Sequence, residues 1–253
     1  MGTKKLSPLI KSLLVTVTYV IPTLLISLLP LPDTLLRLLF LPAYLLYTWF
    51  WVRVVDKQSW KVLQLDVNKK ALKGFLFALV LTAIIVSFSL MIAIFFFHHR
   101  FRGPSAFTPS NLWFAFLSSF VVQGFPEEMV YRGYMLQTLQ TKYSQITSLV
   151  LTTSLFALMH VTHLFTSGII NGLVIVFVAF SFALLAGFLK YFFKTTWAAV
   201  AVHGGLHMTR KLFELAGLET TTLTFFISGL IFLIVSLGLF LSFKNQLKES
   251  YQS

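Results

Sequence analysis

The chain has 253 residues, of which 57% are hydrophobic and only 11% are charged, and its mean hydropathy is +0.84. A soluble domain carries about 25% charged residues, so this composition excludes a soluble globular protein. Each membrane crossing takes about 20 mostly apolar residues. We therefore expect a single polytopic membrane domain over residues 1–253, with no room for a separate soluble domain.

The excess of basic residues fits a lipid bilayer better than nucleic acid. The formal net charge is +12, from 20 Lys and Arg against 8 Asp and Glu. The cations lie in short segments between apolar runs, where they set topology and meet anionic lipid head groups. No aromatic and basic stripe suggests base stacking, so we expect no nucleic-acid partner. The absence of cysteine excludes disulfides, thiolate metal sites and a cysteine nucleophile.

Apolar stretches divide the chain into candidate spans in a regular order. They are residues 8–29, 35–52, 74–97, 112–139, 146–163, 169–189, 197–215 and 223–243. The pattern predicts an all-α integral membrane protein with about eight transmembrane helices. No small-residue cleavage site closes the first stretch, so we expect it to remain as a span. The mixed apolar and basic segment 60–73 predicts an interfacial helix.

The distribution of basic residues predicts the orientation. If the N-terminus is inside and the chain crosses eight times, 14 basic residues fall inside and 5 outside, with Arg132 left within a span. Cytoplasmic segments carry the excess of Lys and Arg. We therefore expect a multi-pass protein of the cell membrane with both termini in the cytoplasm.

Charged residues interrupt the stretch 112–139. Glu127 and Glu128 are adjacent in it, and Arg132 follows. An ionisable group at membrane depth costs about 2.5–3.5 kcal/mol on insertion scales, so such residues usually mark a polar site or pathway. The alternative is that this stretch surfaces at the cytoplasmic interface, where its charges are hydrated. We favour a functional site.

Helical spacing separates the two glutamates. Glu128 and Arg132 are four residues apart, so they share a helix face and can pair. Glu127 points about 100° away and is the freer carboxylate. Pro126 before it suits the first turn of a helix or a kink, and at a first turn the positive helix end would favour the ionised carboxylate. A general base at Glu127 fits this setting.

Histidines lie inside two other apolar stretches. His160 follows Phe156 by one helical turn, and His203 and His207 are four residues apart with two glycines between them that allow close helix approach. A lone histidine is more often a packed, hydrogen-bonded core residue. Three histidines and a glutamate pair in separate apolar stretches instead predict one buried polar cavity.

Such a cavity has two chemical interpretations. A glutamate with a histidine can activate a water, while other histidines donate hydrogen bonds to a developing oxyanion. The same side chains are ordinary zinc ligands, although the signature H-E-x-x-H is absent. No serine has the surroundings of a nucleophile elbow. Hydrolysis with water as the nucleophile is the reaction that these residue types support.

Three motifs in order resemble those of the CAAX prenyl protease and bacteriocin-processing family of intramembrane proteases, the CPBP or Abi family. E-E-x-x-x-R begins at Glu127, F-x-x-x-H ends at His160, and a variant of H-x-x-x-N begins at His203. Each motif alone is weak, but their order and spacing make a strong signal. The motif-bearing core covers about residues 110–215.

The resemblance implies an endopeptidase that cleaves a membrane-associated peptide or protein within the bilayer. Glu127 and His160 would activate the hydrolytic water, and Glu128 and Arg132 would organise the site. A bacterial origin is expected. The substrate is left open among a peptide pheromone, a bacteriocin leader and a membrane-bound fragment.

The resemblance also assigns His203 and His207 to an oxyanion hole. Position 207 is His, where the family often has Asn. A histidine can donate the same hydrogen bond, but it can also bind a metal together with Glu127, His160 and His203. We favour a glutamate protease without a cofactor and keep zinc as the alternative.

Two non-enzymatic functions compete with this interpretation. One is a membrane immunity protein that binds a peptide without cutting it. The other is an ion-coupled transporter, because buried Glu and His also form proton relays. A transporter should show inverted repeats or paired broken helices, and the sequence shows neither.

Overall fold

The computed structural model describes residues 6–97, 103 and 107–249, and these residues form helices and no β-strand. Six helices in this part of the chain are long and apolar enough to cross a membrane: Pro8–Ser27, Asp33–Val55, Lys69–Phe97, Gln145–Thr166, Ile169–Phe193 and Thr222–Ser242. The expected all-α, multi-pass membrane fold is therefore confirmed.

The two remaining predicted stretches are also helical. One is a continuous run formed by α5 (Pro109–Phe116), π-helical Leu117–Gly124, α6 (Phe125–Glu128), π-helical Met129–Met135 and α7 (Leu136–Gln140); we call it the 109–140 helix. The other is α11 (Thr196–Leu215). These two helices carry the glutamate pair, Arg132 and two of the histidines.

Several of the six spans contain a break or a change of helix type. Their segments are α1 (Pro8–Thr18), α2 (Val20–Ser27), α3 (Asp33–Trp49) with π-helical Phe50–Val55, α4 (Lys69–Phe97), α8 (Gln145–Met159) with 3₁₀-helical His160–Thr162, α9 (His163–Thr166), α10 (Ile169–Phe193) and α12 (Thr222–Glu249). Pro22 lies in α2 and Pro42 lies inside α3, where each removes a backbone donor.

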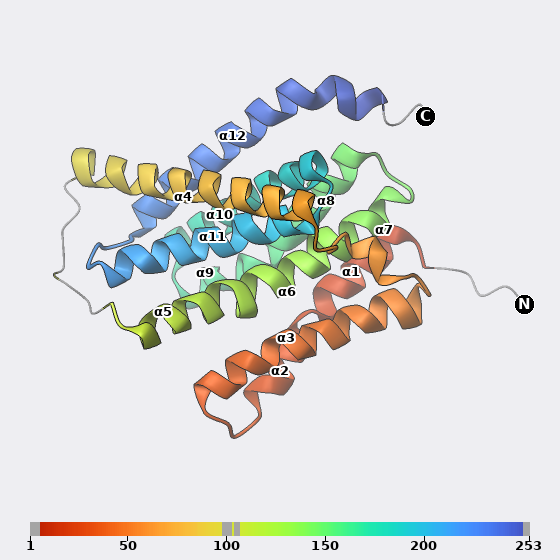
Figure 1. Cartoon of the computed structure of the whole chain (residues 1–253), viewed down its shortest axis with the longest axis horizontal. Coiled ribbons are helices and arrows are strands. Elements are labelled where there is room, and N and C mark those ends of the chain that lie inside the picture. The colour runs from red at the N-terminus through yellow and green to blue at the C-terminus, as the bar shows by residue number, and fades with distance from the viewer. Residues whose placement is uncertain (1–5, 98–102, 104–106, 250–253) are drawn as a thin grey trace, which may run out of the picture.

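Helices α10 and α11 form the centre of the bundle. α11 packs against α4, the 109–140 helix and α10, while α10 also packs against α8 and α12. Figure 1 shows α4, α10, α11 and the 109–140 helix side by side, with α2 and α3 on one side and α12 crossing on the other. The site-bearing helices are thereby enclosed by the other helices.

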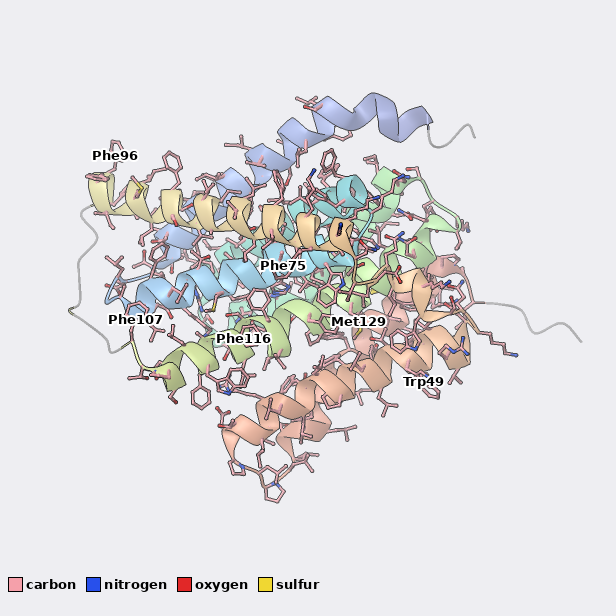
Figure 2. The ribbon with its side chains drawn as sticks, viewed as in Figure 1. Trp49, Phe75, Phe96, Phe107, Phe116 and Met129 are labelled. Atoms are coloured by element: carbon pink, nitrogen blue, oxygen red, sulfur yellow. The ribbon has the colours of Figure 1, made fainter. Side chains whose placement is uncertain are left out.

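The outer surface of the bundle is apolar. Exposed side chains include Leu46 at 64%, Ile84 at 60% and Ile234 at 65% of their full exposure. Figure 2 shows apolar side chains around the ribbons, with Phe96 at the end of α4. In water such a surface would be costly, but lipid tails are equally apolar. The exposed side chains are thus those of a bundle solvated by lipid.

The segment 60–73 does not form the predicted interfacial helix. Trp60–Leu63 forms one 3₁₀ turn, residues 64–68 are not helical, and the rest of the segment is the first turn of α4, which begins at Lys69. The backbone of this segment instead holds the start of α11: Leu63 O accepts from Thr196 Oγ1 at 2.6 Å, and Leu65 O accepts from Trp197 Nε1 at 3.0 Å. These tertiary hydrogen bonds compete successfully with a local helix.

The arrangement is compatible with the expected orientation. The first turn of α1, the end of α7 and the last turn of α12 lie toward one end of the bundle, on the right in Figure 1, and the end of α11 lies toward the other. Four of the basic residues that were counted to predict the orientation lie outside the described residues: Lys4, Lys5, Arg100 and Arg102. Cytoplasmic termini therefore stay a prediction.

Single cysteines test this orientation, because the chain has none of its own. We expect cysteines at Asp66 and Lys142 to be protected from an impermeant thiol reagent in intact cells, and a cysteine at Ser167 to be labelled. The reason is the predicted cytoplasmic placement of the basic segments. Permeabilised cells provide the control, in which all three should react. Labelling of Asp66→Cys in intact cells would contradict the orientation.

Candidate active site

A fully buried carboxylate lies at the centre of the site. Glu128 and Arg132 are both 0% exposed, and Arg132 Nη1 donates to Glu128 Oε1 at 3.1 Å. The same oxygen accepts from Nδ1 of His203 at 3.0 Å. Arg132 also lies over the ring of Phe156, with its guanidinium carbon 4.7 Å from the centroid. One carboxylate therefore joins two helices of the site.

Glu127 has a different environment from its neighbour. Its side chain keeps 18% of its exposure, and its Oε2 lies 4.0 Å from Nε2 of His203. Glu127 faces a cavity of about 520 Å³, whereas the Glu128 carboxylate is held by Arg132 and His203. The structure thus gives the two carboxylates the different surroundings that their helical spacing predicts.

The cavity brings together the residues on which the sequence analysis concentrated. Its described lining includes Gln123, Glu127, His160, His163, Ser167, Asn171, Val174, Ile175, His203, His207, Arg210, Thr220, Thr221, Thr222 and Phe225. They come from the 109–140 helix, from the α8–α9 segment, and from α10, α11 and the start of α12. Four separate apolar stretches thus contribute polar side chains to one space.

His160 lies where the α8 helix tightens into a 3₁₀ turn. Its Nδ1 lies 3.0 Å from the carbonyl oxygen of Phe156. A carbonyl only accepts, so Nδ1 is the donor and the neutral ring presents Nε2 as an acceptor. By the same argument, the Glu128 carboxylate fixes His203 with Nδ1 as donor and Nε2 directed toward Glu127. Each ring nitrogen therefore has a defined role.

Pro126 lies at the start of α6, but α6 follows a π-helical segment without a break, so the free positive helix end expected beside Glu127 does not form there. The chain is helical on both sides of Pro126, with π-helical turns before and after it. Proline has no backbone N–H, which removes one hydrogen bond from a helix interior. Single π-helical turns are frequent at functional sites. The disturbance of the helix expected at Pro126 therefore takes the form of a change between α-helical and π-helical hydrogen bonding.

The 109–140 helix and α11 approach each other closely at two glycines. A Cβ at Gly124 would lie 2.8 Å from the backbone nitrogen of Gly204, and a Cβ at Gly204 would lie 2.3 Å from the ring of Phe120. Small residues allow such contact between membrane helices. This contact is one residue from His203 and three from Glu127, so it sets the distance between the two helices at the site.

Lys190 is a buried cation that the sequence analysis placed with the cytoplasmic residues. It lies on α10 with 1% exposure, and its ammonium group donates to the backbone carbonyl of Arg132. The sequence did hold a signal for this burial, because apolar residues continue after Lys190 as far as Phe193, beyond the predicted stretch 169–189. Gln123, one helical turn before Glu127, and Asn171 also line the cavity and were not singled out.

Zinc is the alternative means of activating a water in this cavity. Among the described residues, no group of three or more His, Asp or Glu side chains is placed to hold one ion together. A structural or catalytic zinc site takes at least three protein ligands about 2.0–2.3 Å from the ion. Zinc therefore stays a hypothesis that metal removal can test.

The motif-bearing part of the chain matches a known family. Residues 109–209 match the model of the Rce1-like family, the type II CAAX prenyl endopeptidases. The matched range contains both glutamates, Arg132 and the four histidines that line the cavity. No curated protein matches the chain. The resemblance inferred from the three motifs is therefore confirmed, and the family implies a protease.

Substitution of Gly124 by alanine should damage the site through its geometry. The added Cβ meets backbone atoms of Gly204, which cannot move aside as a flexible side chain would. We expect lost function and a lower melting temperature. Gly238→Ala is the matched control, because nothing lies within 4 Å of its Cβ and Ala stabilises a helix interior by about 0.5–1 kcal/mol over Gly. Equal effects at both positions would contradict the close-contact argument.

Arg132→Ala should destabilise the fold itself. It leaves the buried Glu128 carboxylate without its cationic partner, and breaking a buried ion pair costs about 3–5 kcal/mol. Thermal unfolding in detergent measures the effect, with Arg53→Ala, at an exposed cation, as the control. An inactive Arg132→Ala protein with wild-type stability would indicate that Arg132 contacts substrate.

Proposed function

We propose that this chain, with its Rce1-like core at residues 109–209, is a CAAX-type intramembrane endopeptidase that uses a water activated by glutamate and histidine. Its substrate is a membrane-associated peptide or protein. The observation that carries the proposal is the separation of the two glutamates. Glu128 is bound by Arg132 and His203, whereas Glu127 is the only acid among the described residues that line the cavity.

Glu127 and His160 hold the hydrolytic water in this mechanism. Glu127 takes a proton from the water as it attacks the scissile carbonyl carbon. The Nε2 of His160 accepts the water's other hydrogen and orients its lone pair, because Nδ1 is occupied by the Phe156 carbonyl. A positioned general base typically contributes about 10²–10⁴-fold in rate.

His207 donates to the oxyanion that forms on the carbonyl. It follows His203 by one helical turn, with ring centroids 5.2 Å apart, and lines the same cavity. His203 presents Nε2 to Glu127 at 4.0 Å, so it carries the proton from Glu127 toward the leaving nitrogen. The C–N bond breaks as that nitrogen gains the proton. The products are a carboxylic acid and an amine, because the second hydrogen of the water stays on the new carboxyl group.

The resemblance assigned His203 and His207 together to an oxyanion hole, whereas in this mechanism His207 donates to the oxyanion and His203 carries a proton. A neutral His203 donates through Nδ1 to Glu128, so its other nitrogen has no proton to give until it receives one. Once protonated, its imidazolium can also stabilise the oxyanion, with Glu128 as the counter-charge. His207 is the oxyanion donor in either protonation state of His203.

Glu127→Gln should abolish cleavage while the protein remains folded. Glutamine keeps the shape of the side chain but cannot take a proton from water, so we expect a loss of about 10²–10⁴-fold in rate. Quantitative proteomics of membrane peptides, comparing cells with the wild-type and Glu127→Gln proteins, measures the effect and identifies substrates. Asp66→Asn, at an exposed acid, is the control. Wild-type processing by Glu127→Gln would favour the immunity or transport functions.

Metal removal distinguishes the metal-free mechanism from a zinc-dependent one. A zinc enzyme should lose activity to a membrane-permeant chelator and regain it with added metal. We expect the purified protein to be indifferent to the chelator, because water activation here uses Glu127 and His160 alone. Loss of activity that only added zinc restores would contradict the metal-free mechanism.

A further inference from the structure

A carboxamide lines the catalytic cavity beside the general base. Gln123 lies one helical turn before Glu127 on the 109–140 helix, and both residues line the same cavity. The Gln123 side chain is partly buried, and within the described part of the chain no group forms a hydrogen bond with it. A polar group in an apolar helix is costly unless it has a partner. The amide donors of Gln123 are therefore available to a molecule in the cavity.

The 109–140 helix and α11 run side by side in opposite directions, as Figure 1 shows. Their contacts follow this arrangement. The ring of Phe125 packs on Trp197 near the start of α11, with centroids 5.3 Å apart. The ring of Phe120, earlier on the 109–140 helix, packs against Gly204, later on α11. Residue numbers thus fall along one helix as they rise along the other.

This antiparallel register places Gln123 at the level of His207. Glu127 faces His203, with its Oε2 4.0 Å from Nε2 of the ring. Gln123 lies one turn before Glu127, and His207 lies one turn after His203, so in antiparallel helices both steps lead the same way in space. Gln123 and His207 also line the same cavity. The site therefore contains two neighbouring pairs, a carboxylate with a histidine and a carboxamide with a histidine.

We propose that Gln123 is a further catalytic residue, whose amide N–H donates to the oxyanion together with His207. This inference rests on the proposed function. His203 donates its Nδ1 proton to Glu128, so His207 would otherwise be the one neutral histidine donor to the developing charge. Glutamine side chains are among the groups that form oxyanion holes. Residues four apart on a helix have Cβ atoms about 5–6 Å apart, which leaves room for a carbonyl with the attacking water at Glu127 and its oxygen at Gln123.

Two other roles for Gln123 make different predictions. If Gln123 only supported the fold, removal of its amide would lower the melting temperature. If it bound a backbone group of the substrate, it would stabilise the planar peptide and the tetrahedral intermediate equally, and its removal would weaken the binding of both. An oxyanion donor instead stabilises the tetrahedral species selectively. A comparison of planar and tetrahedral ligands therefore distinguishes the three roles.

The test measures the Kd of two uncleavable peptides by fluorescence anisotropy, with the protein in lipid nanodiscs. Both are dye-labelled and share one short apolar sequence. One carries a tetrahedral, anionic phosphinate in place of the scissile amide, and the other carries a planar ketomethylene group. The wild type should prefer the phosphinate. Gln123→Met should bind the phosphinate about tenfold to a hundredfold more weakly, the range of a hydrogen bond to a charged group, with the Kd of the ketomethylene peptide and the melting temperature unchanged. Gln123→Asn, which keeps a carboxamide, should lose less.

Gln137→Met is the matched control, because Gln137 lies on the same helix but outside the described lining of the cavity. It should leave both Kd values unchanged. A phosphinate preference that survives Gln123→Met would overturn the inference, as would an equal loss of affinity for both peptides or the same loss in Gln137→Met. Each of these results leaves the proposed function standing. If the wild type itself does not prefer the phosphinate, the proposed function fails and the inference fails with it.

Discussion

The rest of the site depends on the burial of one carboxylate. Glu128 has no exposure, and an unpaired charge in that position would be too costly to keep. Arg132 and His203 stabilise it from its own helix and from α11. Lys190 contacts the Arg132 carbonyl from α10, so a third helix joins the group. These partners occupy Glu128, whereas its neighbour Glu127 faces the cavity, so two adjacent identical residues have different environments.

Close helix packing supplies the second requirement. Hydrocarbon gives little driving force between membrane helices, so association relies on contact and hydrogen bonding. Gly124 and Gly204 allow the 109–140 helix and α11 to touch, and Leu63 and Leu65 hold the start of α11 by their carbonyl groups. Together these contacts fix the position of His203 relative to Glu127. Positioning of this kind contributes to catalysis by holding reacting groups before the reaction begins.

Sequence patterns predicted the helices and the candidate residues because both depend on local spacing. Apolar length gave the spans, and the i to i+4 rule separated Glu128 from Glu127. The same patterns could not predict the register change around Pro126, since π-helical turns alter hydrogen bonding without altering apolar periodicity. Nor could they place Lys190 against Arg132, 58 residues away, or bring Arg210 and Asn171 to the cavity. The interfacial helix predicted for residues 60–73 was wrong for a related reason, because backbone carbonyl groups of this segment accept tertiary hydrogen bonds from α11.

The central claim is that the two adjacent glutamates divide base catalysis and structural support between them. Parallel measurement of Glu127→Gln and Glu128→Gln tests it most directly, with thermal unfolding and peptide processing recorded on the same purified proteins. Glu127→Gln should unfold like the wild type and process nothing. Glu128→Gln should have a lower melting temperature, because it weakens the hydrogen bonds from Arg132 and His203. The opposite pattern, with a stable, inactive Glu128→Gln and an unstable but active Glu127→Gln, would contradict the account.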